Sequence, residues 1–452
     1  MKIVKDINKH IFRGYDIRGV YGNDLNEDVA YTIGKGFGSY IQELGKTVAI
    51  VGHDNRASSP ELSNAFIKGA VETGITVYNI GLVTTPMYYY SWKKLGIVSG
   101  AMITASHNPK EYNGFKIAFD ERGNACGDMI QDFRQYIENG IFKEANGNER
   151  KVDIKEEYLK FIRSSIELGD RKVKVVLDAG NGTGSIVIKE AFKDLNVDAE
   201  FIFCDSDPDF PNHHPDPCVE ANLEKLKKKV LDTKADIGLS VDGDADRIGA
   251  IDEKGNFIPV DYLMIIIWRE LYNKVKNKRA LYDVKCSKSL ADELDKLGLE
   301  KVCYRTGNSY MKAMMIEGDF NFGGELSGHI FFRDKFPGFD DGVYACLRFV
   351  ELLSKTDKNF SELLDGINRY HSTPEIKVKS TDAEKFKVVE KVREYAKTKG
   401  YNINTIDGVR VEFEDGWALV RASNTGPDLT MRFEGTTEER MNQIKEEFMS
   451  LI

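Results

Sequence analysis

The segment "TVAIVGHD" (residues 47–54) and, three residues later, "SSPELSNAFIKGAVETG" (residues 58–74) decide the fold class. The first is an apolar run of strand length, and the second places apolar residues at helical spacing. Ser59 is predicted to cap this helix, with Pro60 at its first position. A buried strand that leads into a helix is the unit from which helix-covered parallel sheets are built, so we expect an α/β protein.

This alternation continues to about residue 370. It predicts strands in "VSGAMITAS" (98–106), "KVKVVLDAG" (172–180) and "DIGLSVDG" (236–243), and helices in "NLEKLKKKVLDT" (222–233) and "SKSLADELDKLG" (287–298). The C-terminal part differs, because "GVRVEFEDGWALVRAS" (408–423) alternates apolar and polar residues around an Asp-Gly turn, as a hairpin does. We therefore expect three related α/β domains with mixed, mostly parallel sheets and a smaller α+β domain, with boundaries at 1–153, 154–254, 255–368 and 369–452.

The composition excludes several classes of protein. The 452 residues are too many for one hydrophobic core, while 41% hydrophobic and 30% charged residues are ordinary for a soluble protein. No apolar run approaches the roughly 20 residues of a membrane span, so no membrane partner is expected. A net charge of −9 without a basic tract argues against nucleic acid. Six scattered cysteines without a CxxC pair indicate the reducing cytoplasm.

The loop "SVDGDADRIGAIDEKGN" (240–256) places Asp242, Asp244 and Asp246 at alternate positions after a predicted strand. Three such carboxylates repel one another unless a cation neutralises them, and oxygen ligands suit Mg²⁺ or Ca²⁺. An EF-hand is excluded, because Arg247 stands where that loop needs glycine. Arg247 beside a metal would suit a phosphoryl group. The alternative is a solvated acidic turn.

Ser106, in "MITASHNPKEYNGFKI" (102–117), also follows a predicted strand. It does not lie in the G-x-S-x-G pattern of acyl-transfer enzymes, and a site with a metal and a guanidinium predicts a serine that accepts phosphate. The donor is not expected to be a nucleotide. "LGKT" (44–47) resembles the end of a P-loop, but its leading glycine position is Tyr40.

Two further loops carry clustered polar residues. In "GGELSGHIFF" (323–332), an extended segment would point Glu325, Ser327 and His329 the same way, as a reader of sugar hydroxyls. A glycine-rich turn with one buried histidine is the alternative. In "RASNTGPDLTMRFEG" (421–435), several donors in a short loop are typical of a phosphate cradle, and equally of an ordinary turn. These donors are Arg421, Ser423, Asn424 and Thr425.

These four loops, in this order and preceded by "FRGYDIRG" (12–19), resemble the α-D-phosphohexomutase family over nearly the whole chain. The resemblance implies four domains around a central cleft, the last like a TATA-binding-protein fold. It implies a phosphate carried on Ser106 and Mg²⁺ held by that phosphoserine with Asp242, Asp244 and Asp246. The residues that match the phosphoserine side are Tyr15, Arg18, His107, Lys116 and Arg247. Those that match the sugar contacts are Lys285, Glu325 and Ser327, and those that match the loop for the non-reacting phosphate are Arg421, Ser423, Asn424 and Thr425.

The implied reaction interconverts mannose or glucose 1-phosphate and 6-phosphate through a hexose 1,6-bisphosphate, which also primes the enzyme. Arg18, Lys116 and His329 are candidates for proton transfer. The chain departs from the family pattern at Asn308, where histidine is usual. It also departs at Gly426 and Asp428, where threonine and an apolar residue are more common. A different sugar preference and an altered phosphate affinity are the expected consequences.

Three other functions compete with this hypothesis. A phosphoglucosamine mutase usually has "GEQSGH", and Leu326 replaces that glutamine here. A Mg²⁺-dependent sugar phosphatase would leave the loop at 421–425 unexplained, and a silent sugar-phosphate sensor would not need Ser106 and the aspartates. We expect a phosphosugar as the only partner of a monomer or weak dimer.

Overall fold

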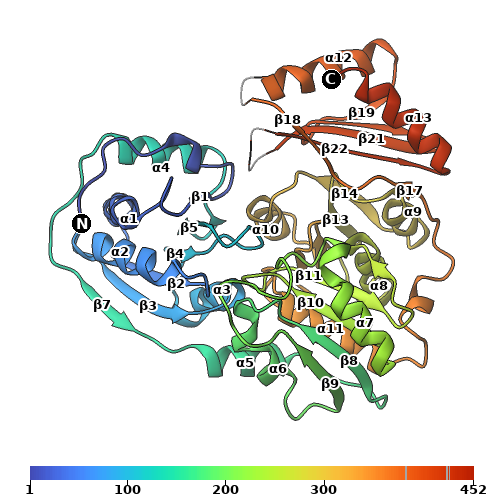
Figure 1. Cartoon of the computed structure of the whole chain (residues 1–452), viewed down its shortest axis with the longest axis horizontal. Coiled ribbons are helices and arrows are strands. Elements are labelled where there is room, and N and C mark those ends of the chain that lie inside the picture. The colour runs from blue at the N-terminus through green and yellow to red at the C-terminus, as the bar shows by residue number, and fades with distance from the viewer. Residues whose placement is uncertain (382–383, 424–425, 427) are drawn as a thin grey trace. The chain divides into compact units, whose positions relative to one another are not determined.

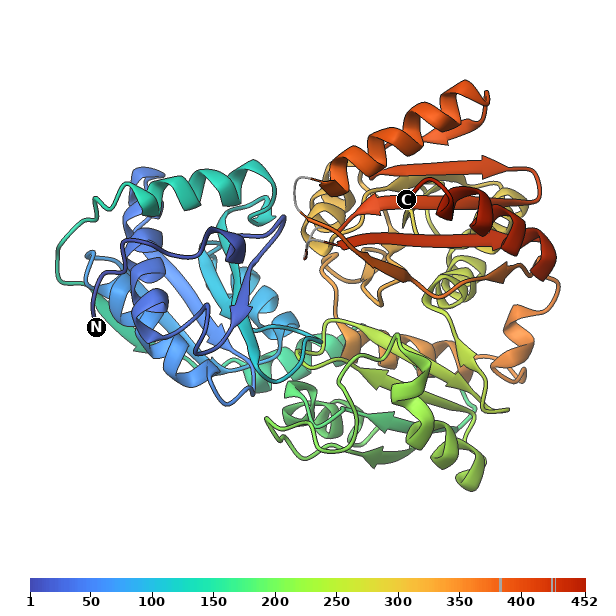
Figure 2. The ribbon, with the colours of Figure 1, turned by 45° about the horizontal axis from the view of Figure 1, so that its top comes forward.

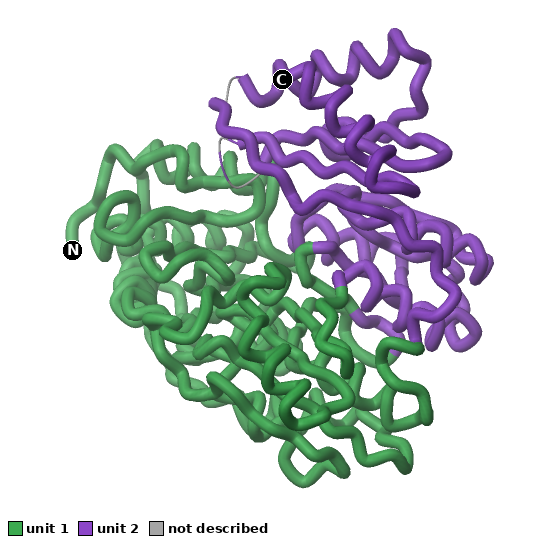
Figure 3. Tube along the Cα trace, turned by 45° about the vertical axis from the view of Figure 1, so that its right-hand side comes forward, with its two compact units in different colours: residues 1–258, 327–331, 335–362 green, residues 259–326, 332–334, 363–452 purple. Residues whose placement is uncertain are grey.

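The computed structural model describes the whole chain except residues 382–383, 424–425 and 427. The chain folds into two compact units (Figure 3). Unit 1 is residues Met1–Ile258 with Ser327–Phe331 and Lys335–Glu362, and unit 2 is Pro259–Leu326 with Phe332–Asp334 and Leu363–Ile452. Four β-sheets with their helices follow one another along the sequence, and each is described by itself below (Figure 1).

The first sheet has the strand order β1-β5-β4-β2-β3-β7, with β6 added on β5. β4–β2–β3–β7 pair in parallel, and β5 runs antiparallel to β4 and β1. The strands are β1 Ile17–Val20, β2 Val48–His53, β3 Thr76–Leu82, β4 Gly100–Ile103, β5 Tyr112–Asp120, β6 Gly123–Asn124 and β7 Asn148–Lys151. The helices are η1 Lys9–Ile11, α1 Glu27–Glu43, α2 Ser59–Val71, α3 Thr85–Leu95 and α4 Asp128–Glu138.

The helix predicted after β2 is present, but its cap is not the expected residue. Ser58 is the N-cap, helix α2 begins at Ser59, and Pro60 follows inside the first turn. The proline is tolerated there because the first N–H groups of a helix have no partner within the helix. Helices α1 and α2 pack so closely that a Cβ on Gly34 would lie 2.1 Å from the carbonyl oxygen of Phe66.

The second sheet has the order β12-β11-β10-β8-β9, parallel across β10, β8 and β9 and antiparallel elsewhere. Helix α11, distant in sequence, packs on β8, β10 and β11. The strands are β8 Val173–Asp178, β9 Val197–Ile202, β10 Ile237–Val241, β11 Ile248–Asp252 and β12 Phe257–Ile258. The helices are α5 Lys155–Ser164, η2 Thr183–Ile186, α6 Ile188–Phe192, η3 Glu220–Leu223, α7 Glu224–Thr233 and α11 Gly342–Ser354.

The third sheet has the order β14-β13-β15-β16 and is parallel across β14, β13 and β15. Its strands are β13 Arg279–Asp283, β14 Glu300–Tyr304, β15 Phe322–Gly324 and β16 Ile330–Phe332, and the accompanying helices are α8 Val260–Leu271, α9 Lys288–Lys296, α10 Asn308–Glu317 and η4 Ser361–Leu364. The extended conformation considered for residues 325–329 is wrong, because these residues form a turn between β15 and β16. Gly328 has φ +101°, a backbone conformation that reverses the chain and that glycine adopts readily.

The fourth sheet is antiparallel, in the order β17-β22-β21-β20-β19, with β18 also paired to β22. Helices α12 and α13 cover one face of it (Figure 2). The elements are β17 His371–Ser372, β18 Ile376–Lys379, α12 Glu384–Thr398, β19 Asn402–Asn404, β20 Val409–Phe413, β21 Gly416–Ala422, β22 Asp428–Gly435 and α13 Glu438–Met449. β20 and β21 form the predicted hairpin, and the four-part α/β architecture with mixed sheets is confirmed.

The helices of the described residues include none with the length and apolar character needed to cross a bilayer.

Candidate active site

Ser106 and the acidic loop meet at the carboxyl ends of two strands of unit 1. Ser106 lies three residues after β4, Asp242 follows β10 directly, and the Ser106 Oγ donates a 2.8 Å hydrogen bond to Asp242 Oδ2. Ser106 has φ +51°, a conformation that is strained for a residue with a side chain. The two loops touch at Gly243, where a Cβ would lie 2.5 Å from the Ser106 carbonyl oxygen.

The aspartate triad (Asp242, Asp244 and Asp246) is almost fully buried and converges. One ligand atom from each carboxylate lies within 4.8 Å of the others. Asp244 Oδ2 and Asp246 Oδ2 accept hydrogen bonds from Lys116 Nζ at 2.8 and 2.5 Å. Their second oxygens, Asp244 Oδ1 and Asp246 Oδ1, are buried without a hydrogen-bond partner among the described residues. Buried carboxylate oxygens left over in this way fit a bound metal ion.

The charges of the triad and of Lys116 shift the pKa values of Asp242, Asp244 and Lys116. Burial and repulsion from the other two aspartates raise the pKa of Asp242 well above its usual value. Burial acts in the same sense on Asp244, but the charge of Lys116 and hydrogen bonds from Lys116 and Thr85 outweigh it and lower the pKa of Asp244. Burial disfavours the charge of Lys116, but the adjacent carboxylates raise the pKa of Lys116 well above its usual value, so the amine keeps its proton.

A second chain of contacts links Arg247 to His329. The Arg247 Nε–H donates to His329 Nε2 at 3.0 Å, which leaves the ring proton on Nδ1, 2.7 Å from Asp340 Oδ2. His329 Nδ1 has no hydrogen-bond partner among the described residues, so its contact with Asp340 is electrostatic. Arg247 Nε also lies 3.8 Å from Asp242 Oδ2. Burial lowers the pKa of Arg247, but the charges of Asp242 and other acidic groups outweigh burial and raise this pKa above its usual value.

The other predicted phosphoserine-side residues belong to the same region of unit 1. His107 Nδ1 lies 3.3 Å from the Ser106 Oγ, and burial with the charges of Arg247 and Arg18 lowers the pKa of His107 well below its usual value. Arg18 contacts the Asn108 side chain at 2.9 Å and Asp16 at 2.5 Å. Tyr15 is half-buried in the turn that leads into β1.

The sugar-side candidates are divided between the units. Ser327, half-buried, belongs to unit 1, whereas Lys285, Asn308 and Glu325 are buried in unit 2. Lys285 Nζ pairs with Glu375 Oε1 at 2.7 Å. The charge of Lys285 lowers the pKa of Glu375 to about 2, while Glu375 and Asp283 outweigh burial and raise the pKa of Lys285.

Two contacts fix the backbone around these sugar-side residues. Glu325 accepts a hydrogen bond from the Gly307 N–H. Asn308, the residue after Gly307, begins helix α10. Asp283, at the end of β13, accepts from the Leu326 N–H at 3.2 Å and from the Thr306 hydroxyl at 3.1 Å.

The phosphate-loop candidates are described only in part, because Asn424 and Thr425 lie outside the described residues. Arg421 is 5% exposed, and its Nε donates to Asp407 Oδ2 at 2.9 Å. Lys385, at the start of α12, donates to the carbonyl oxygens of Ser423 and Gly426 at 3.1 and 3.0 Å.

Sequence reasoning did not identify several residues that support the site. Thr85 donates to Asp244 Oδ2 at 2.6 Å, Arg56 contacts the Ser106 loop, and Asp340 and Glu375 approach predicted site residues. One signal was available: "HDNRASS" follows strand β2 at the edge where such sheets bind ligands. Asp340 and Glu375 carry no local signal of this kind.

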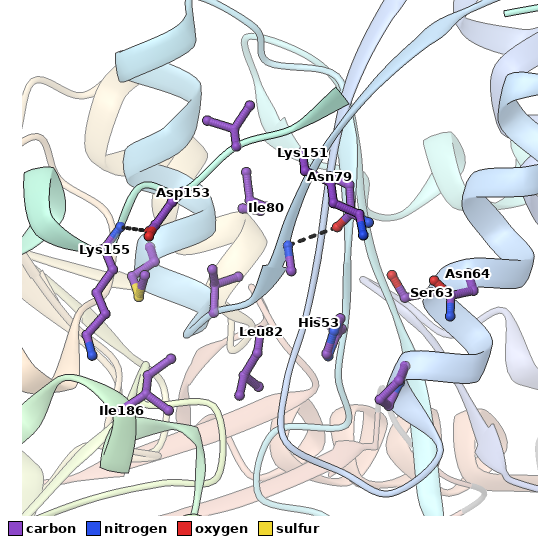
Figure 4. A pocket seen from close by; sticks show the side chains of 15 residues that line it. His53, Ser63, Asn64, Asn79, Ile80, Leu82, Lys151, Asp153, Lys155 and Ile186 are labelled. Atoms are coloured by element: carbon purple, nitrogen blue, oxygen red, sulfur yellow. Dashed lines mark hydrogen bonds between the residues drawn. The ribbon is translucent and has the colours of Figure 1, made fainter. Parts of the chain in front are cut away.

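A cavity of about 790 Å³ in unit 1 lies elsewhere (Figure 4). It is lined by His53, Asn79, Leu82, Lys151 and Lys155 among others, and by none of the predicted site residues that the structure describes. Lys151 and Lys155 share this cavity with Asp153. This cavity is therefore not part of the candidate site around Ser106.

Comparison with known proteins agrees with the fold. Residues 9–147, 156–255 and 259–370 match the α/β/α domains I, II and III of phosphoglucomutase/phosphomannomutase, and residues 375–451 match its C-terminal domain. This set of domains defines a class of multidomain sugar-phosphate mutases. The chain belongs to the phosphoglucomutase/phosphomannomutase family.

Individual relatives cover nearly the whole chain. A phosphomannomutase/phosphoglucomutase of Pseudomonas putida is 40% identical over 97% of this chain and 94% of its own length. A phosphoglucomutase of Neisseria meningitidis is 39% identical over 99% and 97%. The crystal structure of a Burkholderia thailandensis phosphoglucomutase/phosphomannomutase family protein superimposes with a TM-score of 0.90 at 36% identity, over 99% and 97%. The chain is thus a mutase, an isomerase that interconverts hexose 1-phosphates and hexose 6-phosphates.

Proposed function

We propose that this mutase works through phosphate carried on Ser106 and a hexose 1,6-bisphosphate intermediate, with glucose and mannose phosphates as substrates. The observation that carries the proposal is the hydrogen bond from the Ser106 Oγ to Asp242 inside the buried triad. A hydroxyl held at a cluster of carboxylates, with Lys116 and Arg247 beside it, is placed where a phosphoryl group and a metal would offset one another's charge.

The aspartate triad is the proposed Mg²⁺ site, together with an oxygen of the phosphorylated Ser106. Its hard oxygen donors, and the buried oxygens of Asp244 and Asp246 left without partners among the described residues, fit this ion. When bound, Mg²⁺ would stabilise the negative charge of the transferring phosphoryl group as a Lewis acid.

In the proposed step, the bond between the Ser106 Oγ and phosphorus breaks while the free hydroxyl oxygen of the sugar phosphate bonds to phosphorus. The hydroxyl proton leaves to a group within hydrogen-bond reach, and the serine alkoxide is left beside Lys116 and Arg247. In the second half, the other phosphate of the bisphosphate returns to the Ser106 Oγ and the sugar oxygen takes back a proton. The phosphate on Ser106 is thereby restored, and the serine hydroxyl proton is passed on to the base.

The described contacts support one of the three candidates for proton transfer, Lys116. His329 has Arg247 on one ring nitrogen and Asp340 near the other, and Arg18 is charged and held by Asp16. Lys116 Nζ donates to Asp244 and Asp246 of the triad, whose third member Asp242 accepts from the Ser106 Oγ, so we assign Lys116 the role of proton donor to the leaving oxygen. The deprotonated Lys116 amine would then be the base for the return step.

The sugar-side residues and those of the phosphate loop are proposed to bind the parts of the substrate that do not react. Glu325 and Ser327 would accept hydrogen bonds from sugar hydroxyls, with Lys285 and Asn308 next to the ring. The non-reacting phosphate is assigned to Arg421, Ser423, Asn424 and Thr425. Arg421 supports this assignment because it is a buried cation, and a guanidinium can bind a phosphate with several hydrogen bonds.

The proposal is tested by ³¹P NMR with Mg²⁺, a trace of glucose 1,6-bisphosphate and one sugar per tube. Glucose, mannose and glucosamine 1-phosphates are run side by side. We expect 6-phosphate resonances from glucose and mannose 1-phosphates, and slower conversion of the glucosamine compound, since Leu326 replaces the glutamine usual in glucosamine mutases. Release of inorganic phosphate instead would indicate a phosphatase, and conversion of glucosamine 1-phosphate alone would refute the proposed substrates.

A further inference from the structure

Arg56 is the most completely engaged buried cation near the Ser106 loop. It lies in the turn after β2 and is 1% exposed. It is not among the residues that the family resemblance matched. Its guanidinium faces the loop that joins β4 to β5, which contains Ser106. A charge buried this deeply is costly unless every donor finds a partner.

All five guanidinium N–H groups have partners. One terminal nitrogen donates to the carbonyl oxygens of Ser106 and Asn108, both at 2.7 Å, and the other to those of Pro109 and Tyr112, at 2.7 and 3.1 Å. The remaining Nε–H donates to a carboxylate oxygen of Asp54 at 3.2 Å. Four carbonyls within seven consecutive residues are thus held by one rigid, planar group.

Arg56 is itself fixed by its own turn. Asp54 Oδ1 accepts from the Arg56 backbone N–H at 3.0 Å and from the Ser59 hydroxyl at 2.5 Å, so the carboxylate is anchored to the start of α2. The ring of Phe210 lies 5.4 Å from the guanidinium carbon. These contacts hold the guanidinium in one orientation, and its hydrogen bonds in turn fix the positions of the loop carbonyls.

The loop needs such a restraint because its key residue is strained. Ser106 adopts φ +51°, a strained conformation that persists only where surrounding contacts over-determine the backbone. The Ser106 N–H is bonded to the Thr104 hydroxyl at 2.9 Å and its carbonyl to Arg56 at 2.7 Å. Both backbone groups of the strained residue are therefore held, one on each side.

We propose that Arg56 is a positioning residue that holds Ser106 in its strained conformation, with the Oγ aimed at the aspartate triad and at the reacting phosphoryl group. The inference rests on the proposed phosphoserine mechanism. The Arg56 guanidinium donates its described hydrogen bonds to backbone carbonyls and Asp54 alone, so it acts through the loop and not on the substrate.

The test compares Arg56→Lys with the wild-type enzyme and with Arg348→Lys. A lysine keeps the positive charge but has three donors without a planar fork, so it cannot hold four carbonyls and Asp54 together. Arg348 is an equally buried arginine, 2% exposed, that pairs with Glu351 within α11. Its lysine variant reports what the loss of a buried guanidinium costs in stability alone.

Each dephosphorylated protein is incubated with Mg²⁺ and glucose 1,6-bisphosphate. Phosphate on Ser106 is followed by intact mass, and kcat, KM for glucose 1-phosphate and Tm are measured. For Arg56→Lys we expect the rate of Ser106 phosphorylation and kcat to fall roughly 10- to 100-fold, because a misplaced reacting group is costly. KM should stay within about twofold of wild type, because this loop does not hold the ground-state sugar. Arg348→Lys should lose Tm but keep the phosphorylation rate and kcat.

The outcomes separate this inference from the function on which it rests. Wild-type phosphorylation with an unchanged rate in Arg56→Lys, or an equal loss in Arg348→Lys, overturns the positioning role. A wild-type protein that never acquires phosphate overturns the proposed function itself. If Arg56→Lys does not fold, Asp54→Asn decides: it turns one acceptor oxygen beside Arg56 into a donor amide, and an unchanged kcat in that folded variant refutes the inference.

Discussion

The Ser106 region of unit 1 and the Lys285–Arg421 region of unit 2 both contain buried charges, but they balance them differently. In unit 1, two of the three buried carboxylates share Lys116, and Arg247 approaches the third, Asp242, only at 3.8 Å. In unit 2, Lys285 and Arg421 each have a close carboxylate: Glu375 lies 2.7 Å from Lys285 and Asp407 lies 2.9 Å from Arg421. The triad therefore has an excess of negative charge over Lys116 and Arg247, whereas Lys285 and Arg421 are each paired with a carboxylate.

This difference indicates what each region does when a ligand arrives. A region with surplus carboxylates and a raised pKa at Asp242 is completed by a cation, and only then tolerates a phosphoryl group. In a region of paired cations, a phosphate must compete with carboxylates already in place, so binding exchanges one partner for another. Substitutions in unit 1 are accordingly expected to act on kcat, and those in unit 2 on KM.

The largest effect is expected from Ser106→Ala, which removes the atom that carries phosphate. We expect kcat for glucose 1-phosphate to fall by at least about 10³-fold, with no phosphate on the protein by intact mass. Ser185→Ala is the matched control, since Ser185 follows another strand of unit 1 and its Oγ contacts no polar group among the described residues. Near wild-type turnover by Ser106→Ala would refute the phosphoserine mechanism.

A smaller but still large loss is expected from Asp244→Asn. It removes one of the three charges that a metal would neutralise, so we expect kcat to fall roughly 10²-fold and the Mg²⁺ concentration for half activation to rise. Asp252→Asn is the control, because Asp252 is also buried but only orders the turn after β11. Chelator titrations measure the effect. If Asp244→Asn keeps full activity in chelator, the metal assignment is wrong.

The unit 2 counterpart is Arg421→Gln, with a smaller expected effect of a different kind. Loss of a charge-assisted contact to the non-reacting phosphate should raise KM roughly 10-fold while kcat falls less. Arg440→Gln, which breaks a partly exposed pair with Asp415, is the control and should leave KM unchanged. Initial rates over a range of glucose 1-phosphate would separate the two constants. A fall in kcat alone would contradict the contrast between the regions.

Much of this arrangement could be predicted from sequence because it depends on local pattern. The apolar run at 47–54 and the helical spacing after it gave β2 and α2, and the alternation at 408–423 gave the hairpin of β20 and β21. Likewise, alternate aspartates after an apolar strand predicted a convergent triad. The three polar residues at 325–329 had the same alternation but form a turn, since five residues with glycine at 328 are too few to distinguish the two conformations.

The missed features depend on contacts between distant segments. Arg56 bonds to carbonyls 50 to 56 residues away, and a carbonyl leaves no signature in the side-chain sequence. Asp340 approaches His329 from just before helix α11, which packs on the second sheet. Such partners are chosen by tertiary packing and not by local propensity.

The smallest expected effect concerns the pH dependence of the Lys285–Glu375 pair. The pKa of Glu375 is lowered from 4.5 to about 2 in the folded protein, so between these values the unfolded chain binds more protons and stability rises with pH. The contribution of the pair is therefore complete above about pH 4.5 and is lost as pH falls towards 2. Because the Glu375 side chain is about one-third exposed, solvent screening keeps the effect on Tm to a few degrees.

Glu375→Gln isolates this contribution. Its Tm should lie below that of wild type at pH 6, and the difference should shrink as the pH is lowered from 5 to 3, because Glu375 is then progressively protonated in the unfolded wild-type chain while it stays ionised in the folded one. Glu384→Gln is the control, since its pair with Lys387 is exposed and its Tm difference should stay small at every pH. A Glu375→Gln difference that does not change with pH would mean that the side chain contributes packing alone. Lys285 would then not depend on a paired carboxylate for its charge balance, which is the property that separates it from Lys116 and Arg247 in this comparison.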